Sequence, residues 1–304
     1  MNADTKRLVI AHLCMAGACT CWGLMAPFGK DAMTHGLDGI DLATMRIVGG
    51  AILFWLTSFF VKKEKVPNRD KFRLAGAGLF GLGLNQGCFT VGLSLTSPVN
   101  ASIITTSLPI FAMILSAIIL KERLTKLKVN GVLLGCIGAI ILVLASANAE
   151  NEQKESLLGD LLCMCGQFSF ALYLSLFNPL IKRYSVFTVN KWMFLWASLF
   201  MLPFTGYHLI SDLCHGIPLK TWLEAGYVVC FGTYLGYILV MIGQHTLKPT
   251  VVSVYNYLQP IVAVSVTLFL GLAVLKINHI FAIILIFSGV GMVIRSQSKK
   301  IGKS

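Results

Sequence analysis

Four side chains with hydrogen-bonding groups lie deep inside apolar stretches of the sequence. Asn85 and Gln86 are adjacent within one stretch, and Tyr234 and Tyr237 occupy the matching part of another. Amides and phenols can bind a zwitterion or another polar group without carrying a net charge. We therefore interpret these four residues as part of a site for a small polar molecule.

A second polar group accompanies two prolines. Pro109 and Pro260 each lie about 16 Å along a predicted helix, and the residues beside them are Thr105, Asn256, Tyr257 and Gln259. A proline inside a helix removes a backbone hydrogen bond, so we expect a bend at each, either as a fixed kink or beside a central cavity. The polar residues favour the cavity, and the alternative is hydrogen bonding between helices.

Two aromatic residues are candidates for the walls of the same cavity. Trp22 lies too far from either end of its apolar stretch to be a simple interfacial anchor, and Tyr173 lies within another stretch. Both side chains could instead serve only in helix packing.

Arg46 is the clear exception to the lack of formal charge in the apolar stretches. A charge inside the membrane suggests a function, here a clamp for a substrate carboxylate. Its position near the outer end also allows it to extend outward or to pair with Asp38 or Asp41.

Glu122 lies at the cytoplasmic end of its stretch, where we expect it to form part of a gate. Its expected partners are Arg123, Lys126 or the loop lysines.

The composition requires that the elements carrying these residues lie in a membrane. Hydrophobic residues make up 56% of the 304 residues and charged residues only 12%, about half the charged fraction of a soluble domain. A membrane-spanning helix needs about 20 apolar residues. The sequence predicts an all-α integral membrane protein with ten transmembrane helices, near 8–29, 40–61, 73–94, 98–120, 127–146, 157–178, 188–210, 220–243, 249–271 and 276–294.

Basic residues set the orientation of these helices. With the N-terminus in the cytoplasm, 20 Lys and Arg residues lie on the inside and four on the outside. The positive-inside rule therefore predicts a multi-pass protein of the inner (plasma) membrane with both termini cytoplasmic. The lipid bilayer is then its main partner, and the net charge of +12 does not indicate nucleic-acid binding.

The two halves of the sequence form an internal repeat. Pro98 and Pro249 are 151 residues apart, as are Pro109 and Pro260, and Gly81 matches Gly232 at the same offset. Five helices in each half reverse the orientation of the second half, giving the inverted repeat of many secondary transporters. We assign the repeats to residues 1–147 (helices 1–5) and 148–304 (helices 6–10).

These patterns resemble the EamA family of the drug/metabolite transporter superfamily. The resemblance rests on Ser107–Ala112, on Leu120–Leu124 and on the glycines from Gly131 to Gly138, in that order. It implies a central cavity between the halves and the export of amino acids or related small metabolites. One departure is Ala273, which occupies a position where the family often has Glu, so Glu122 has no equivalent in the second half.

Other functions fit the sequence less well. The short loops lack the charged or metal-binding cluster that a membrane enzyme needs, and we expect neither catalysis nor a cofactor or metal. A carrier or flippase for a nucleotide-linked or lipid-linked sugar remains the alternative, although phosphates would favour more buried basic residues than Arg46 alone. Glycine spacings suit close helix packing but leave the oligomeric state open.

Overall fold

The computed structural model describes residues 3–96, 98–146, 157–214, 216–269 and 277–301. Within these ranges the chain is helical and contains no strand. Consecutive helical segments follow one another in ten long helical units, which we call rods. The first five are α1 (Ala3–Thr34), α2 (Gly39–Ser58), α3–η1–α4 (Asn68–Gly78, Leu79–Leu84, Asn85–Leu95), α5–α6 (Pro98–Thr105, Leu108–Ile119) and α7 (Lys126–Ser146).

The last five rods repeat this order. They are α8 (Leu157–Leu176) with the short α9 (Asn178–Ile181), α10 (Val186–Cys214), α11–η2–α12 (Leu219–Tyr227, Val228–Leu235, Gly236–Thr246), α13–η3–α14 (Pro249–Val254, Tyr255–Tyr257, Leu258–Phe269) and α15 (Ile277–Ile301). The boundary at 147/148 and Ala273 both lie outside the described residues.

Seven helices in the described ranges are long and apolar enough to cross a membrane. The other three predicted spans, within 68–95, 186–214 and 249–269, are also helical. The all-α membrane fold is thus confirmed, whereas the count of ten crossings stays a prediction. Large apolar side chains such as Phe60, Phe204 and Phe269 are exposed, as expected where lipid rather than water surrounds the protein.

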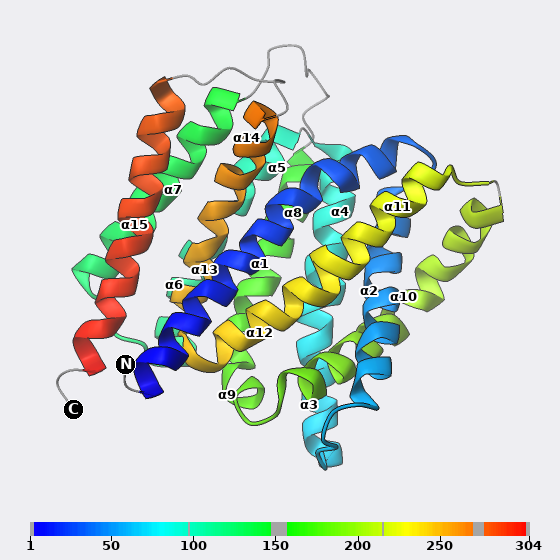
Figure 1. Ribbon diagram of the computed structural model, residues 1–304, viewed down its shortest axis with the longest axis horizontal. Coiled ribbons are helices and arrows are strands. Elements are labelled where there is room, and N and C mark those ends of the chain that lie inside the picture. The colour runs from blue at the N-terminus through cyan, green and yellow to red at the C-terminus, as the bar shows by residue number, and fades with distance from the viewer. Residues whose placement is uncertain (1–2, 97, 147–156, 215, 270–276, 302–304) are drawn as a thin grey trace.

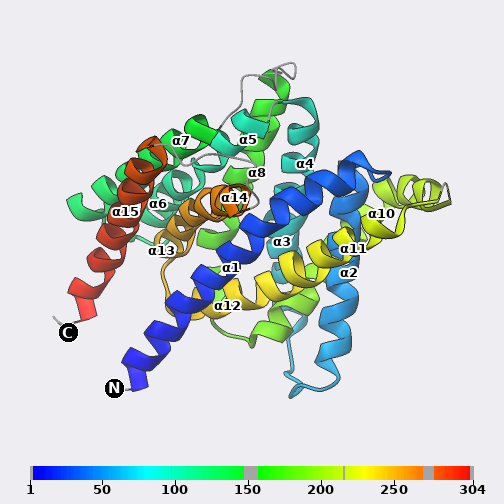
Figure 2. The ribbon, with the colours of Figure 1, turned by 45° about the horizontal axis from the view of Figure 1, so that its top comes forward.

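The packing of the rods follows an approximate two-fold symmetry. An offset of 151 residues carries α4 onto α12, and it carries α1 and α6 approximately onto α8 and α14. Correspondingly, α1 packs on α12 and α14, and α8 packs on α4 and α6. Figures 1 and 2 show α1 beside α11 and α12, and they show α1 beginning and α15 ending at the same end of the molecule.

Glycines allow the helices α7 and α15 to approach each other closely along their lengths (Figure 1). A Cβ atom at Gly289 would lie 2.6 Å from the carbonyl oxygen of Gly131 and 2.6 Å from the nitrogen of Gly135. Side chains are excluded where two backbones come this close, which is the usual role of small residues between membrane helices. This pair relates the fifth helix of one half to the fifth of the other.

Candidate functional site

Three hydrogen bonds join residues that occupy the same position in the two halves. Each pair is separated by 151 residues: Gln86 Nε2 donates to Tyr237 Oη (3.2 Å), Tyr257 Oη to the Thr106 carbonyl oxygen (3.4 Å), and Ser198 Oγ to the Ile47 carbonyl oxygen (3.4 Å). Residues related by a two-fold axis can touch only at that axis. These contacts therefore mark the line along which the two halves meet.

Both helices that carry the first contact are irregular beside it. The segments η1 and η2 are π-helical and occupy equivalent positions in the two halves. Tyr237 Oη donates to the Gly81 carbonyl oxygen in η1 (3.4 Å), and Trp22 Nε1 donates to the Gly232 carbonyl oxygen in η2 (2.8 Å). Segments of π-helix are uncommon and occur frequently at functional sites, so we place the centre of the candidate site between η1 and η2.

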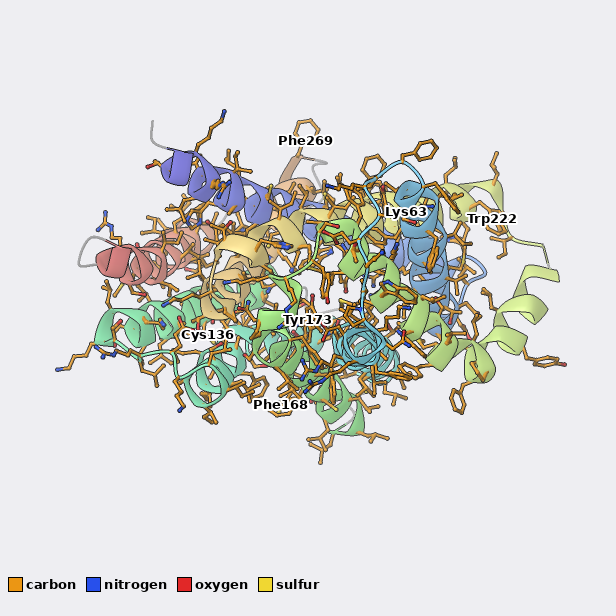
Figure 3. The ribbon with its side chains drawn as sticks, turned by 90° about the horizontal axis from the view of Figure 1, so that it is seen from below. Lys63, Cys136, Phe168, Tyr173, Trp222 and Phe269 are labelled. Atoms are coloured by element: carbon orange, nitrogen blue, oxygen red, sulfur yellow. The ribbon has the colours of Figure 1, made fainter. Side chains whose placement is uncertain are left out.

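Trp22 and Tyr173 are also equivalent at the offset of 151, and each lies against a π-helical segment. A Cβ atom on Gly81 would come within 2.8 Å of the Tyr173 ring, and one on Gly236 within 3.0 Å of Trp22 Nε1. Figure 3 shows Tyr173 in the middle of the molecule, whereas Phe269 lies at its margin. The aromatic residues proposed from the sequence therefore come together at the centre.

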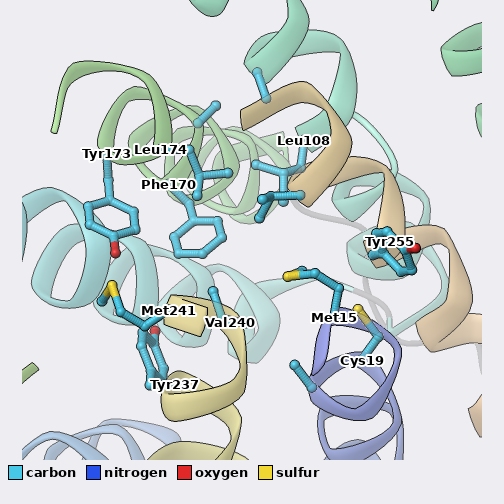
Figure 4. Packing of buried hydrophobic residues seen from close by; sticks show 14 of the residues in the cluster. Met15, Cys19, Leu108, Phe170, Tyr173, Leu174, Tyr237, Val240, Met241 and Tyr255 are labelled. Atoms are coloured by element: carbon cyan, nitrogen blue, oxygen red, sulfur yellow. The ribbon is translucent and has the colours of Figure 1, made fainter. Parts of the chain in front are cut away.

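Gln244 belongs to this centre but was not identified from the sequence. Its Oε1 accepts a hydrogen bond from Tyr173 Oη (3.1 Å). Gln244 lies just beyond the end of the predicted span 220–243, so its position in the sequence gave no reason to select it. Figure 4 shows Tyr173 and Phe170 of α8 facing Tyr237 and Met241 of α12.

Two buried amide atoms at the centre have no hydrogen-bond partner within the described structure. They are Gln86 Oε1 and Gln244 Nε2, on side chains only 4% and 1% exposed. Because a buried polar group without a partner costs about 1–3 kcal/mol, these atoms are natural contacts for a polar ligand.

The two helices in which a bend was predicted are interrupted at equivalent positions. The stretch 98–120 divides into α5 and α6 on either side of Thr106 and Ser107, and Pro109 lies in the first turn of α6. In the second half, η3 interrupts the stretch and Pro260 follows at the start of α14. Each proline therefore begins the second part of a broken helix, where a missing N–H is tolerated.

The polar residues around these breaks have different surroundings. Tyr257 is buried on the axis, where its hydroxyl also donates to the Val132 carbonyl oxygen (3.1 Å). Thr105 donates to the Ser102 carbonyl oxygen, Asn256 to that of Ser253, and Gln259 to Asn256 Oδ1. Local bonds thus occupy these last three residues, whereas Tyr257 joins the halves.

Asn85 and Tyr234 lie next to the central site and make contacts between helices. Asn85 Nδ2 donates to the Gly166 carbonyl oxygen on α8 (3.0 Å), and Tyr234 Oη lies 2.6 Å from Thr57 Oγ1 on α2. In this structure both residues use their polar groups for helix packing.

Arg46 points toward the second half of the protein. Its Nε donates to Thr233 Oγ1 in η2 (3.1 Å), and its charge lies within electrostatic range of Tyr237. The residue is half-buried. Among the described residues no ion pair joins Arg46 to a carboxylate, so the expected pairing with Asp38 or Asp41 is not seen.

Glu122 is the centre of a buried cluster between the end of α6 and the start of α7. Its Oε1 accepts from Lys128 Nζ at 2.6 Å and lies 3.8 Å from Lys248 Nζ, while its Oε2 accepts from Thr250 Oγ1 at 3.1 Å. Burial and the charge of Lys248 lower the pKa of Lys182 nearby, and Glu122 opposes that shift. Of the expected partners, neither Arg123 nor Lys126 forms an ion pair with Glu122 in the described residues. The partners are Lys128 and the loop residue Lys248, and Lys248 and Thr250 connect the cluster to the second half.

Comparison with known proteins agrees with this architecture. A transporter from Bacillus subtilis (strain 168), "Uncharacterized transporter YyaM", is 26% identical over 270 residues, which are 88% of this chain and 84% of that protein. A "Probable amino-acid metabolite efflux pump" from Salmonella typhimurium is 27% identical over 230 residues, or 71% of this chain and 72% of that one. A solved crystal structure with 18% identity has the same fold, with a TM-score of 0.74 over 95% of this chain and 96% of that one.

The family model gives the assignment. The description "EamA-like transporter family" matches twice, over residues 9–144 and 157–295. The two matches coincide with the two sets of five rods, whose central contacts lie on a common axis. The chain therefore belongs to the EamA-like transporter family.

Proposed function

We propose that this protein is a secondary transporter of the inner membrane that exports amino acids or related small metabolites. The observation that carries the proposal is the hydrogen bond between Gln86 and Tyr237, which lies on the axis between the halves and leaves Gln86 Oε1 without a partner. Substrate sites of inverted-repeat transporters lie at this interface, near the middle of the membrane.

The helix packing suggests how access to the site changes. In one group α1 packs on α12 and α14, and in the other α8 packs on α4 and α6. Gln86 with Tyr237, and Tyr173 with Gln244, join the two groups at the centre. A rocking motion of one group against the other would break these bonds and open the site first to one side of the membrane and then to the other.

The chemistry of the site favours small polar substrates. The central contacts are amides, tyrosine hydroxyls and aromatic rings, with Trp22 edge-on to Tyr237 at 6.0 Å between centroids. The relative named as an amino-acid metabolite efflux pump supports the same substrate class. The repeats at 1–147 and 148–304 and the cytoplasmic termini are part of the proposal.

A counterflow assay in proteoliposomes tests this function. Vesicles with purified protein are loaded with unlabelled amino acids and given a labelled amino-acid pool, with and without a pH gradient. We expect neutral amino acids to exchange only in vesicles that contain the protein. If no amino acid exchanges while nucleotide-linked or lipid-linked sugars do, the sugar-carrier alternative replaces the proposal.

A further inference from the structure

We infer that Arg46 selects substrates that carry a carboxylate and that Gln86 and Gln244 contact the remaining polar groups of the same molecule. This inference rests on the proposed function, because it names the chemical class that the central site would accept. The inference gives a role to the charge of Arg46 and to Gln86 and Gln244, each of which has one amide atom without a hydrogen-bond partner in the described structure.

The position of Arg46 places its charge inside the membrane and beside the central site. The residue is about 10 Å along α2 from Gly39, counted at 1.5 Å per residue. Its bond to Thr233 directs the side chain toward η2 rather than toward the outer end of its own helix. Tyr237, within electrostatic range of the guanidinium, is the hydrogen-bond partner of Gln86.

The hydrogen-bonding capacity of Arg46 is largely unused. A guanidinium has five N–H donors, and the bond to Thr233 engages only the Nε donor. The side chain is half-buried rather than sealed, so its remaining donors can be reached. A carboxylate can accept two parallel hydrogen bonds from such a fork, which is the geometry for which arginine is best suited.

The charge balance points to the same ligand. No carboxylate among the described residues forms an ion pair with Arg46, and a half-buried charge at a position predicted to lie inside the membrane is costly when no opposite charge is near. A substrate carboxylate would supply the missing negative charge. A cationic molecule of the same size would instead add a second positive charge to the site.

The two amides provide a donor and an acceptor for the rest of the molecule. Gln86 Oε1 can accept a hydrogen bond from an ammonium or hydroxyl group, and Gln244 Nε2 can donate one to a second oxygen. Because neither amide carries charge, the site has no strong preference for an ammonium group. The order of binding should therefore be 2-oxo acid equal to or tighter than the amino acid, and both much tighter than the amino-acid amide.

Three molecules with one carbon skeleton test this order: a neutral α-amino acid, its 2-oxo acid and its α-amide. The readout is the rise in melting temperature of the purified full-length protein in detergent, titrated with each molecule. We expect the two carboxylates to stabilise the wild type and the amide to have no effect. Arg46→Gln should weaken carboxylate binding about tenfold or more, as expected on losing a charge-assisted pair. Arg295→Gln, at an exposed position, is the matched control.

Arg46→Lys keeps the positive charge but cannot make two parallel hydrogen bonds to a carboxylate. We therefore expect it to bind both acids more weakly than the wild type does, with the same ranking of the three molecules. This variant also provides the test if Arg46→Gln does not fold. The inference is overturned if the amide binds as well as the acids, if neither acid stabilises the wild type, or if Arg46→Gln responds like the wild type. The proposed function fails separately, through the absence of amino-acid exchange in vesicles. Arg46-dependent binding of the 2-oxo acid would then still support the carboxylate site.

Discussion

Gln86 and Tyr237 are equivalent residues of two inverted halves, and the side chain of one donates a hydrogen bond to the other. A contact between equivalent residues lies on the symmetry axis, and Gln86 on α4 and Tyr237 on α12 also belong to the two different helix groups. Any motion that separates these groups at the centre must therefore break or rearrange the contact. The same tyrosine hydroxyl also reaches the carbonyl oxygen of Gly81 in η1. This pair therefore links the fold to the transport cycle.

Tyr237→Phe removes the hydroxyl that makes both bonds and keeps the ring that packs on Trp22 and Phe194. It leaves Gln86 Nε2 without its partner, at a cost of about 1–3 kcal/mol. We expect lower thermal stability and a several-fold slower exchange rate in proteoliposomes. Tyr207→Phe is the control, because Tyr207 is 88% exposed, and equal effects of the two changes would exclude a special role for Tyr237.

Gly289→Ala should destabilise the pair of helices α7 and α15. The added methyl group would overlap the backbone of Gly131 and Gly135, and such overpacking costs about 1–3 kcal/mol. Gly291→Ala, on the same helix, adds a methyl group that meets nothing within 4 Å. Melting curves in detergent should show a loss for the first variant alone, and comparable loss for both would mean that the close approach is not what stabilises the pair.

Glu122→Gln should destabilise the cluster around Glu122 more than removal of both Glu122 and Lys128 does. The side chains of Glu122 and Lys128 are each only 5% exposed, and removing one partner of such a pair costs about 3–5 kcal/mol. The double variant Glu122→Gln with Lys128→Met leaves no unpaired charge from this pair and should recover part of the lost stability. A double variant less stable than Glu122→Gln would show that Lys128 is held mainly by other contacts, and Arg123→Gln at an exposed site is the control.

Asp70, which precedes the predicted third span, provides a pH test outside the membrane. The hydrogen bond from Tyr184 lowers the pKa of Asp70, and Arg183 and Arg73 lower it further. A carboxyl group with a lowered pKa stabilises the fold above its unfolded pKa of about 3.9 and loses this effect as the pH falls through the folded value. Asp70→Asn should therefore melt below the wild type from pH 8 to pH 5, and the gap should close only below about pH 4. A gap that closes by pH 6 would contradict this assignment.

Much of the fold could be predicted from the sequence because membrane helices depend on local composition. The lengths of the apolar stretches predicted the long helices. The matched prolines predicted the internal repeat and pointed to the regions near Pro109 and Pro260 where the helices are interrupted. The π-helical segments were not predicted from the sequence. They accept hydrogen bonds at Gly81 and Gly232 from Tyr237 and Trp22 on other helices, and such distant contacts cannot be read from local composition.

The candidate site was predictable only in part for the same reason. Polar and aromatic residues inside apolar stretches identified Gln86 and Tyr237, which meet on the axis. Asn85 was selected by the same criterion but contacts a neighbouring helix through Gly166. Gln244 was missed because its importance depends on Tyr173, which is 71 residues away. Which polar residues face the axis depends on the rotation of each helix, and packing against distant parts of the chain sets that rotation.

Cross-linking across the axis tests the central claim most directly. In a version of the protein without its native cysteines, Gln86→Cys and Tyr237→Cys place one thiol on each half, and a short bifunctional thiol reagent joins them. We expect the cysteine substitutions themselves to slow amino-acid exchange in proteoliposomes, because they remove the contact between Gln86 and Tyr237, so each variant is compared with its own rate before treatment. We predict that cross-linking stops the exchange that remains in the double variant, that cleavage of the link restores it, and that the reagent does not lower the rate of either single cysteine variant. Undiminished exchange through fully cross-linked protein would show that the two helix groups do not separate at this contact during transport.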